Sequence, residues 1–139
     1  MPHGNPLHDL RNNARADASI PPDESYSSSD VNGTWVDMSA ISGPVSFCCQ
    51  VGSASGSPSA FSINFYLEEA DDSSGTNGAV VGTQTEVTIT ADDGHGIGHA
   101  ITTKPFVRVV VDDGDSSYTG GTTPAIEVNA LVLAQKANY

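Results

Sequence analysis

The stretch Ser59–Ala70 (SAFSINFYLEEA) decides the fold class of this chain. Residues two apart share one face of a β-strand. One face of this stretch would carry Phe61, Ile63, Phe65 and Leu67, and the opposite face would carry Ser62, Asn64 and Tyr66. A period of two with aromatic and β-branched residues predicts a strand that buries one of its faces.

The same period recurs from Thr34 onward and marks six further candidate strands. These are Thr34–Met38, Pro44–Val51, Thr83–Ala91, Ile97–Thr103, Phe106–Asp112 and Ile126–Ala134. Turn segments rich in Gly, Asp and Ser separate them, and no helical pattern lies between strands, which disfavours a parallel sheet. The sequence therefore predicts an all-β fold, an antiparallel β-sandwich or jelly roll of about seven to eight strands. Apolar residues on both faces of Ile126–Ala134 predict that this strand is buried on both sides.

The first 31 residues have a different pattern. Asn5-Pro6 provides a helix N-cap and a proline at the first helical position, and Leu7, Leu10 and Ala14 follow at helical spacing. This predicts a short helix over about Pro6 to Asp17, followed by an extended exit at Pro21-Pro22. We expect residues 1–31 to form an extended or short-helical arm and linker, and residues 32–139 to form the sandwich domain.

The charge balance excludes several classes of partner. In 139 residues, enough for one domain, there are 5 Lys and Arg against 17 Asp and Glu, a formal net charge of -12. Nucleic-acid binding needs clustered basic residues, and so does binding to anionic lipid. The chain has no apolar run near the roughly 20 residues of a membrane span, and Met1–Leu10 lacks the features of a secretory signal.

The acidic residues are unevenly distributed along the chain. Residues 1–20 contain two aspartates and two arginines, whereas residues 21–139 contain fifteen acidic residues and only Lys104, Arg108 and Lys136 as basic ones. A strongly acidic body stays solvated and repels its own kind, but a neutral arm can lie against another protein. We therefore expect the arm to bind a partner and the body to face solvent.

Pairs of aspartates lie at predicted turns: Asp71-Asp72, Asp92-Asp93, and Asp112-Asp113 with Asp115. Such carboxylates can ligate calcium, which takes six to eight oxygens, but the spacing of an EF-hand loop is absent. Aspartate also favours turns by bonding to nearby backbone amides. Turn chemistry is the main interpretation, and Asp112, Asp113 and Asp115 remain weak candidates for a metal site.

Two other polar groupings have simple interpretations. His95 and His99, which follow Asp92-Asp93, could ligate zinc, but the glycines between them predict a flexible loop. Cys48 and Cys49 are adjacent in a predicted strand, so their side chains point to opposite faces and cannot form an ordinary disulfide. Both are expected to be small buried hydrophobic residues.

Local signatures of catalysis are missing. The segment Gly52–Gly56 has Ala54 where a nucleophile elbow would have serine. The glycine-rich stretch Gly75–Gly82 lacks the Lys-Ser/Thr pair of a phosphate-binding loop. We expect neither an enzyme nor a cofactor.

Several segments taken in order resemble one group of proteins. They are the arm with Leu7, Leu10 and Arg11, then Gly33–Met38, Gly43–Phe47, Phe65–Gly75, Phe106–Val111 and Ala130–Ala134. This order is similar to that of small structural proteins of tailed bacteriophages found among the head-assembly proteins. The resemblance covers most of the chain, although each motif is a strand-and-turn pattern of low specificity. The strong acidity and the cysteine pair depart from the group.

The resemblance implies a β-sandwich in the virion and an auxiliary role as a capsid decoration or cement protein. Such a protein would be made in the host cytoplasm, would lie on the capsid surface in many copies or as a homo-oligomer, and would bind the major capsid protein or other virion proteins. We predict that Leu7, Leu10, Arg11 and Arg15 of the arm make the anchoring contacts. On a helix, Arg11 and Arg15 would present one positive face to an acidic partner.

Two alternatives remain. The same fold could serve as a neck or tail component of the virion. Sandwiches also occur as calcium-dependent carbohydrate-binding modules, which usually present exposed aromatic residues on one face. The plausible aromatic residues are Tyr26, Trp35, Tyr118 and Tyr139, which lie in scattered segments.

Overall fold

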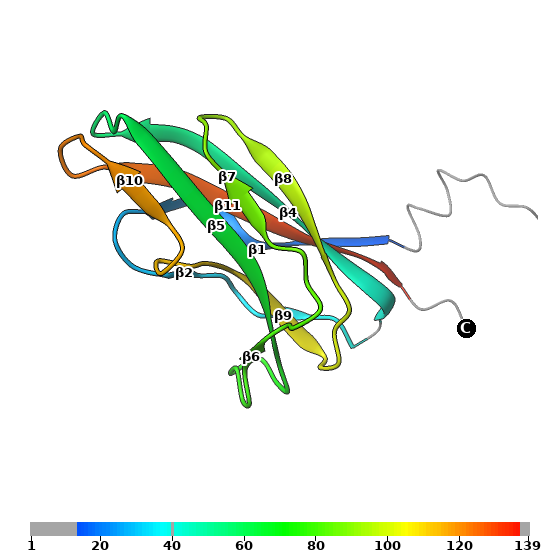
Figure 1. Ribbon diagram of the computed structural model, residues 1–139. Coiled ribbons are helices and arrows are strands. Elements are labelled where there is room, and N and C mark those ends of the chain that lie inside the picture. The colour runs from blue at the N-terminus through cyan, green and yellow to red at the C-terminus, as the bar shows by residue number, and fades with distance from the viewer. Residues whose placement is uncertain (1–13, 40, 137–139) are drawn as a thin grey trace, which may run out of the picture.

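The computed structural model describes residues 14–39 and 41–136, in which every regular element is a β-strand. Figure 1 shows these strands as two layers, with β5 crossing in front of β11. The strands are β1 (Ala14–Tyr26), β2 (Val31–Asn32), β3 (Val36–Asp37), β4 (Ile41–Ser55), β5 (Ala60–Ala70), β6 (Ala79–Val80), β7 (Val87–Ile89), β8 (His95–Ala100), β9 (Phe106–Val111), β10 (Ser117–Thr119) and β11 (Ala125–Lys136). Within the described residues, no helix is long and apolar enough to cross a membrane.

All strand pairs are antiparallel and form two sheets. The four-stranded sheet has the order β1-β11-β4-β8. The seven-stranded sheet has the order β10-β5-β9-β2, with β3 paired to β9 and with β6 and β7 paired to β5. The prediction of an all-β antiparallel sandwich is confirmed. The strand number is higher than predicted because five of the strands contain only two or three residues.

The core lies between the two sheets. The four-stranded sheet contributes inward side chains such as Phe47 and Val128, and the seven-stranded sheet contributes Ile63, Phe65 and Val109, all fully buried. The face expected to be buried in Ser59–Ala70 is confirmed for Ile63, Phe65 and Leu67, whereas Phe61 is half-buried and Asn64 on the opposite face is buried as well. Burial of these apolar side chains is the main favourable term in folding.

The N-terminal helix predicted over about Pro6 to Asp17 is wrong for the residues that the structure describes. Ala14–Asp17 are the start of β1, which pairs with β11 from Ala14 opposite Gln135 to Tyr26 opposite Ile126. Tertiary pairing overrides the helical spacing here, since an edge strand gains a ladder of hydrogen bonds and buries Ile20 and Tyr26 in the core. Residues 14–26 are therefore part of the sandwich, although we assigned them to the arm and linker.

Ser19 of β1 connects the two sheets. Its side chain is fully buried. The hydroxyl accepts a hydrogen bond from the amide of Val109 (2.9 Å) and donates one to the carbonyl oxygen of Thr34 (3.1 Å). The amide of Thr34 donates in turn to the carbonyl oxygen of Ser19 (2.7 Å). The edge of the four-stranded sheet is thus fixed to β9 by satisfied polar groups in an otherwise apolar interior.

Strand β11 is buried on one face, so the prediction of burial on both faces is wrong. Ile126, Val128 and Val132 are buried, but Leu131 is 42% exposed on the opposite face. The strand is central in its sheet, yet no described element covers the outer side of that sheet.

The segment with alternating glycines is a strand and not the flexible loop that we predicted. Gly96 and Gly98 of β8 face inward. A β-carbon on Gly96 would lie 2.7 Å from Val87 Cγ1, and a β-carbon on Gly98 would lie 2.2 Å from Phe47 Cζ. The glycines therefore allow β8 to approach the core closely, while His95, Ile97 and His99 face outward.

Candidate partner-binding face

The outer face of the four-stranded sheet carries aligned rows of uncharged side chains. The strand register places Ala18, Leu131, Cys48 and Ile97 in one row across the sheet. One flanking row contains Ala16, Leu133, Ser46 and His99, and the other contains Asn129, Gln50 and His95. We call these three rows the neutral face, because they contain no Asp, Glu, Lys or Arg.

The centre of the neutral face is apolar and accessible. Ile97 is 55% exposed and Leu131 is 42% exposed, with Cys48 half-buried between them. A single exposed apolar residue is ordinary. A row of them across four strands, in a chain of net charge -12, marks a surface that can meet a partner without bringing charges together.

The residues that we predicted as anchors lie at or beyond the beginning of β1. Leu7, Leu10 and Arg11 fall outside the described residues. Arg15 is the second residue of β1 and pairs with Ala134 of β11. The predicted anchoring segment is therefore joined to an edge strand of the sheet that bears the neutral face.

The predicted turn at Asp71-Asp72 is present, and both carboxylates accept hydrogen bonds from residues of the turn. Asp72 Oδ1 accepts hydrogen bonds from the amides of Ser74 (2.9 Å) and Thr76 (3.1 Å). Hydrogen bonds from Thr76, first from its side chain, lower the pKa of Asp72. Asp71 Oδ2 accepts from the side-chain amide of Asn77 (2.6 Å).

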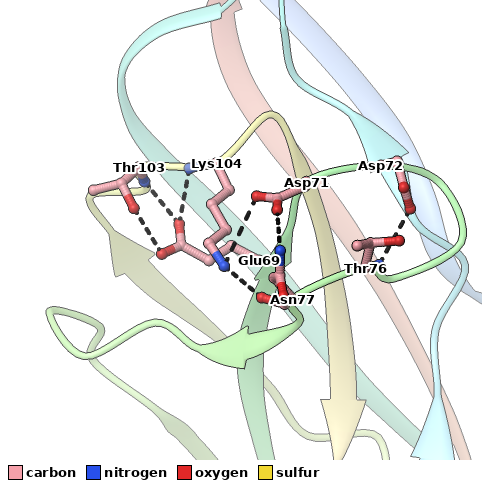
Figure 2. Close-up of polar contacts among 7 residues, drawn as sticks. All are labelled: Glu69, Asp71, Asp72, Thr76, Asn77, Thr103 and Lys104. Carbon is pink, nitrogen blue, oxygen red and sulfur yellow. Dashed lines mark hydrogen bonds and ion pairs between the residues drawn. The ribbon is translucent and has the colours of Figure 1, made fainter.

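The same turn is tied to the connection between β8 and β9, as Figure 2 shows. Buried Glu69 accepts hydrogen bonds from the amide of Thr103 (2.7 Å), from its hydroxyl (3.0 Å) and from the amide of Lys104 (3.2 Å). The ammonium of Lys104 donates to the carbonyl oxygen of Asn77 and forms an ion pair with Asp71 at 3.9 Å. These polar groups hold one end of the sandwich together.

The weak metal candidates Asp112, Asp113 and Asp115 also lie in a turn. Asp112 Oδ1 accepts from the amide of Gly114 (2.9 Å), and Asp113 Oδ1 accepts from the hydroxyl of buried Tyr26 (2.7 Å). Burial and this contact with Asp113 raise the pKa of Tyr26. Within residues 14–39 and 41–136, no three His, Cys, Asp or Glu side chains come together as a metal site.

The histidines and cysteines occupy positions that differ in part from our predictions. His95 and His99 share the outer face of β8, with Ile97 between them, and His99 Nδ1 lies 3.0 Å from the hydroxyl of Ser46. Cys49 is buried as predicted, and burial raises the pKa of its thiol. Cys48 is only half-buried, because its face of β4 is the outer one.

On the outer side of the seven-stranded sheet, Arg108 has its partners within the chain. The guanidinium of Arg108 lies 2.9 Å from the carboxylate of Glu68 and 4.5 Å from the ring centre of Trp35. Trp35 also contacts the 71–78 turn, since a β-carbon on Gly75 would lie 3.0 Å from its Nε1. Burial, followed by the charges of Glu68, Asp112 and Asp30, raises the pKa of Tyr66 to about 12.

The aromatic residues considered for carbohydrate binding do not form a platform. Tyr26 is buried, Trp35 is half-buried beneath Arg108, and Tyr118 packs against the core. Tyr139 lies outside the described residues. This arrangement does not favour the carbohydrate-binding alternative, which depends on exposed aromatic rings sharing one face.

Two shallow depressions, of about 280 Å³ and 300 Å³, lie in the described part of the chain. The first is lined mainly by Ser57–Phe61 and Thr90–Asp92. The second is bordered by the carboxylates of Asp23, Glu24 and Glu127. Its negative border disfavours anionic ligands.

The neutral face was not among our predicted sites. Each of its segments carried a partial signal, since the residues two positions before and after Ala16, Cys48, Ile97 and Leu131 are all uncharged or histidine. Only the register across the four strands shows that these residues lie side by side and form one surface.

Comparisons with known proteins give little further information. No protein-family model and no curated protein matches the chain. One solved structure with a similar course of the chain is the crystal structure of the SPBc2 prophage-derived protein YomS. The match covers 87% of this chain and 93% of that one, at 13% sequence identity and a TM-score of 0.44.

Proposed function

We propose that this chain is a non-enzymatic structural protein of a phage virion, a decoration or cement protein that binds the capsid shell through its N-terminal arm. Leu7, Leu10, Arg11 and Arg15 make the anchoring contacts, and the acidic sandwich stays exposed on the capsid surface. The resemblance of the strand-and-turn segments to phage head proteins supports this role.

The observation that carries the proposal is the integration of β1 into the sandwich. β1 pairs with β11 along most of its length. Ser19 fixes its middle to β9, and Tyr26 fixes its end to Asp113. A segment that precedes such a strand is attached to a rigid body, so contacts made by the arm would hold the whole sandwich in place. Short anchoring segments suit repeated binding on a lattice, where weak contacts add up.

The distribution of acidic residues supports the same role. The carboxylates of Asp72, Asp112 and Asp113 accept hydrogen bonds from their own turns or from Tyr26. They therefore stabilise the fold and keep its surface negative, which opposes unspecific association of a protein present in many copies.

The test uses the full chain and empty heads purified from the phage that encodes it. A double variant, Leu7→Asp with Leu10→Asp, should lower binding to the heads at least tenfold in a co-sedimentation assay. Val80→Asp, which alters an exposed residue of the seven-stranded sheet, is the matched control and should bind like the parent chain. A double variant that still saturates the heads would remove the arm from the mechanism.

A cryo-electron microscopy map of the assembled particle separates the decoration role from a neck or tail role. Density for the sandwich repeated over the capsid facets would agree with decoration. Density restricted to one vertex or to the tail would contradict the proposed role and favour the neck or tail alternative.

A further inference from the structure

We propose that two copies of this chain associate through their neutral faces, with the four-stranded sheets packed face to face about a two-fold axis that runs over β4. The pairing is a property of the sandwich itself. It goes beyond the proposed shell binding and does not depend on the arm.

Charge identifies a second copy as the partner. Two chains of net charge -12 repel one another wherever their acidic turns approach. A basic partner would be drawn to those turns rather than to a face without charged residues. The neutral face is where a like-charged copy can come close, and at physiological salt, charges beyond about 8 Å are largely screened. The nearest acidic residue along β11 is Glu127, two positions before Asn129.

The central row is complementary to itself. Leu131 on β11 and Ile97 on β8 lie on either side of Cys48 on β4. A two-fold axis over β4 places Leu131 of one copy against Ile97 of the other, with the two Cys48 side chains near the axis. This is the isologous contact expected of a symmetric dimer. Packed sheets lie about 10 Å apart, which suits two medium-sized apolar side chains meeting at each side.

The size of the face sets the strength of the association. The neutral face has rows of four, four and three residues. With strands about 4.8 Å apart and residues of one face about 6.6 Å apart along a strand, it covers about 350 Å² per copy. A stable interface buries about 800 Å² per partner. The dimer is therefore weak in dilute solution, and it would gain strength wherever many copies are held close together.

Sedimentation velocity of the full chain over a concentration series up to the millimolar range tests the pairing. The parent chain should shift from monomer to dimer with concentration, and added salt should favour the dimer. Leu131→Asp and Ile97→Asp each place a like charge on both sides of the contact and should raise the dissociation constant at least tenfold. Val80→Asp, an equally exposed apolar position on the other sheet, is the matched control and should dimerise like the parent.

Cross-linking at Cys48 gives an independent readout that needs no folding-sensitive variant. A short bis-maleimide is the suitable probe, because sheets about 10 Å apart exceed the roughly 5.5–6 Å between α-carbons of a disulfide. It should capture a dimer of the parent chain, and Cys48→Ser should abolish capture, since Cys49 is buried. A parent chain that stays monomeric throughout the concentration series would overturn the proposal. So would equal weakening by Val80→Asp. Protection of Cys48 from a monofunctional maleimide while the chain is monomeric would assign the face to a segment of the same chain and overturn it too.

Discussion

The outer faces of the two sheets differ in charge and in the partners of their side chains. On the seven-stranded sheet, Arg108 pairs with Glu68 and lies against Trp35, so its charged groups already have partners in the chain. On the four-stranded sheet, the row that contains Leu131, Cys48 and Ile97 has no charge to satisfy and leaves apolar surface accessible.

This difference indicates where a strongly acidic protein can present a surface that binds a partner. Acidic residues in the turns and on both sheets keep the surface negative and oppose unspecific association, while the register of the four-stranded sheet leaves three successive outer rows without Asp, Glu, Lys or Arg. Charged groups that are already paired within the chain gain little from contact with a partner. Covering an uncharged apolar row removes apolar surface from water, which is favourable. The following predictions test whether the two faces belong to one rigid body and whether their electrostatics differ as described.

The largest effect is expected from a methyl group at the tightest point of the four-stranded sheet. Gly98→Ala places a β-carbon 2.2 Å from Phe47 Cζ and 2.5 Å from the carbonyl oxygen of Thr85. Phe47 is fully buried and Thr85 contributes backbone, so neither can move cheaply. Overpacking of this kind costs about 3 kcal/mol, measured as a loss in the free energy of unfolding in denaturant. It would loosen β8 and with it one side of the neutral face.

Gly82→Ala is the control for that substitution, because a β-carbon at Gly82 meets nothing within 4 Å. Its free energy of unfolding should stay within about 0.5 kcal/mol of the parent value. Equal stability of the two variants would show that β8 does not lie against the core as described.

A smaller loss is expected where the two sheets are joined. Ser19→Ala removes the acceptor for the amide of Val109, which is 2.9 Å from the hydroxyl, and leaves that buried donor unsatisfied. The cost is about 2 kcal/mol. Chemical denaturation is the measurement, with Ser53→Ala, an exposed position on β4, as the control that should change stability by less than about 0.5 kcal/mol. Identical losses in both variants would contradict a polar connection between the sheets.

The part of the fold that the sequence predicts is the part with large apolar side chains at period two. Strands β5 and β9 were predicted because Phe65 and Val109 have neighbours of the same kind two residues away, and this pattern needs no tertiary information. β1 was missed because Ala16, Ala18 and Ser19 carry no such pattern. Its conformation comes from pairing with β11, which is a tertiary effect that local spacing cannot reveal.

The candidate site was predicted less well than the fold, for a related reason. The neutral face joins residues that are far apart in the sequence, such as Ala18, Cys48 and Ile97, and a shift of one residue in the register would turn each to the core. Without the register, the sequence predicts a buried Cys48 and a loop at His95. The turn chemistry of Asp72 and Asp112 was predictable, since it depends on amides within four residues.

The smallest effect on stability is expected at high pH, from Tyr66 on the outer face of the seven-stranded sheet. The pKa of Tyr66 is raised from 10.0 to about 12, first by burial and then by the charges of Glu68, Asp112 and Asp30. Between pH 10 and pH 12 the unfolded chain releases this proton while the folded chain keeps it, so Tyr66 makes the fold less stable as the pH rises. Tyr66→Phe should therefore reduce the loss in the free energy of unfolding between pH 9 and pH 11.5, measured by denaturant titration.

Part of this loss in Tyr66→Phe remains because the pKa of Tyr26 is raised as well. The comparison of each protein with itself at pH 7, where both tyrosines are neutral, corrects for the loss of the hydroxyl. An unchanged pH dependence in Tyr66→Phe would mean that neither burial nor the neighbouring carboxylates raise the pKa of Tyr66 in the folded chain, and it would contradict the environment described for this residue.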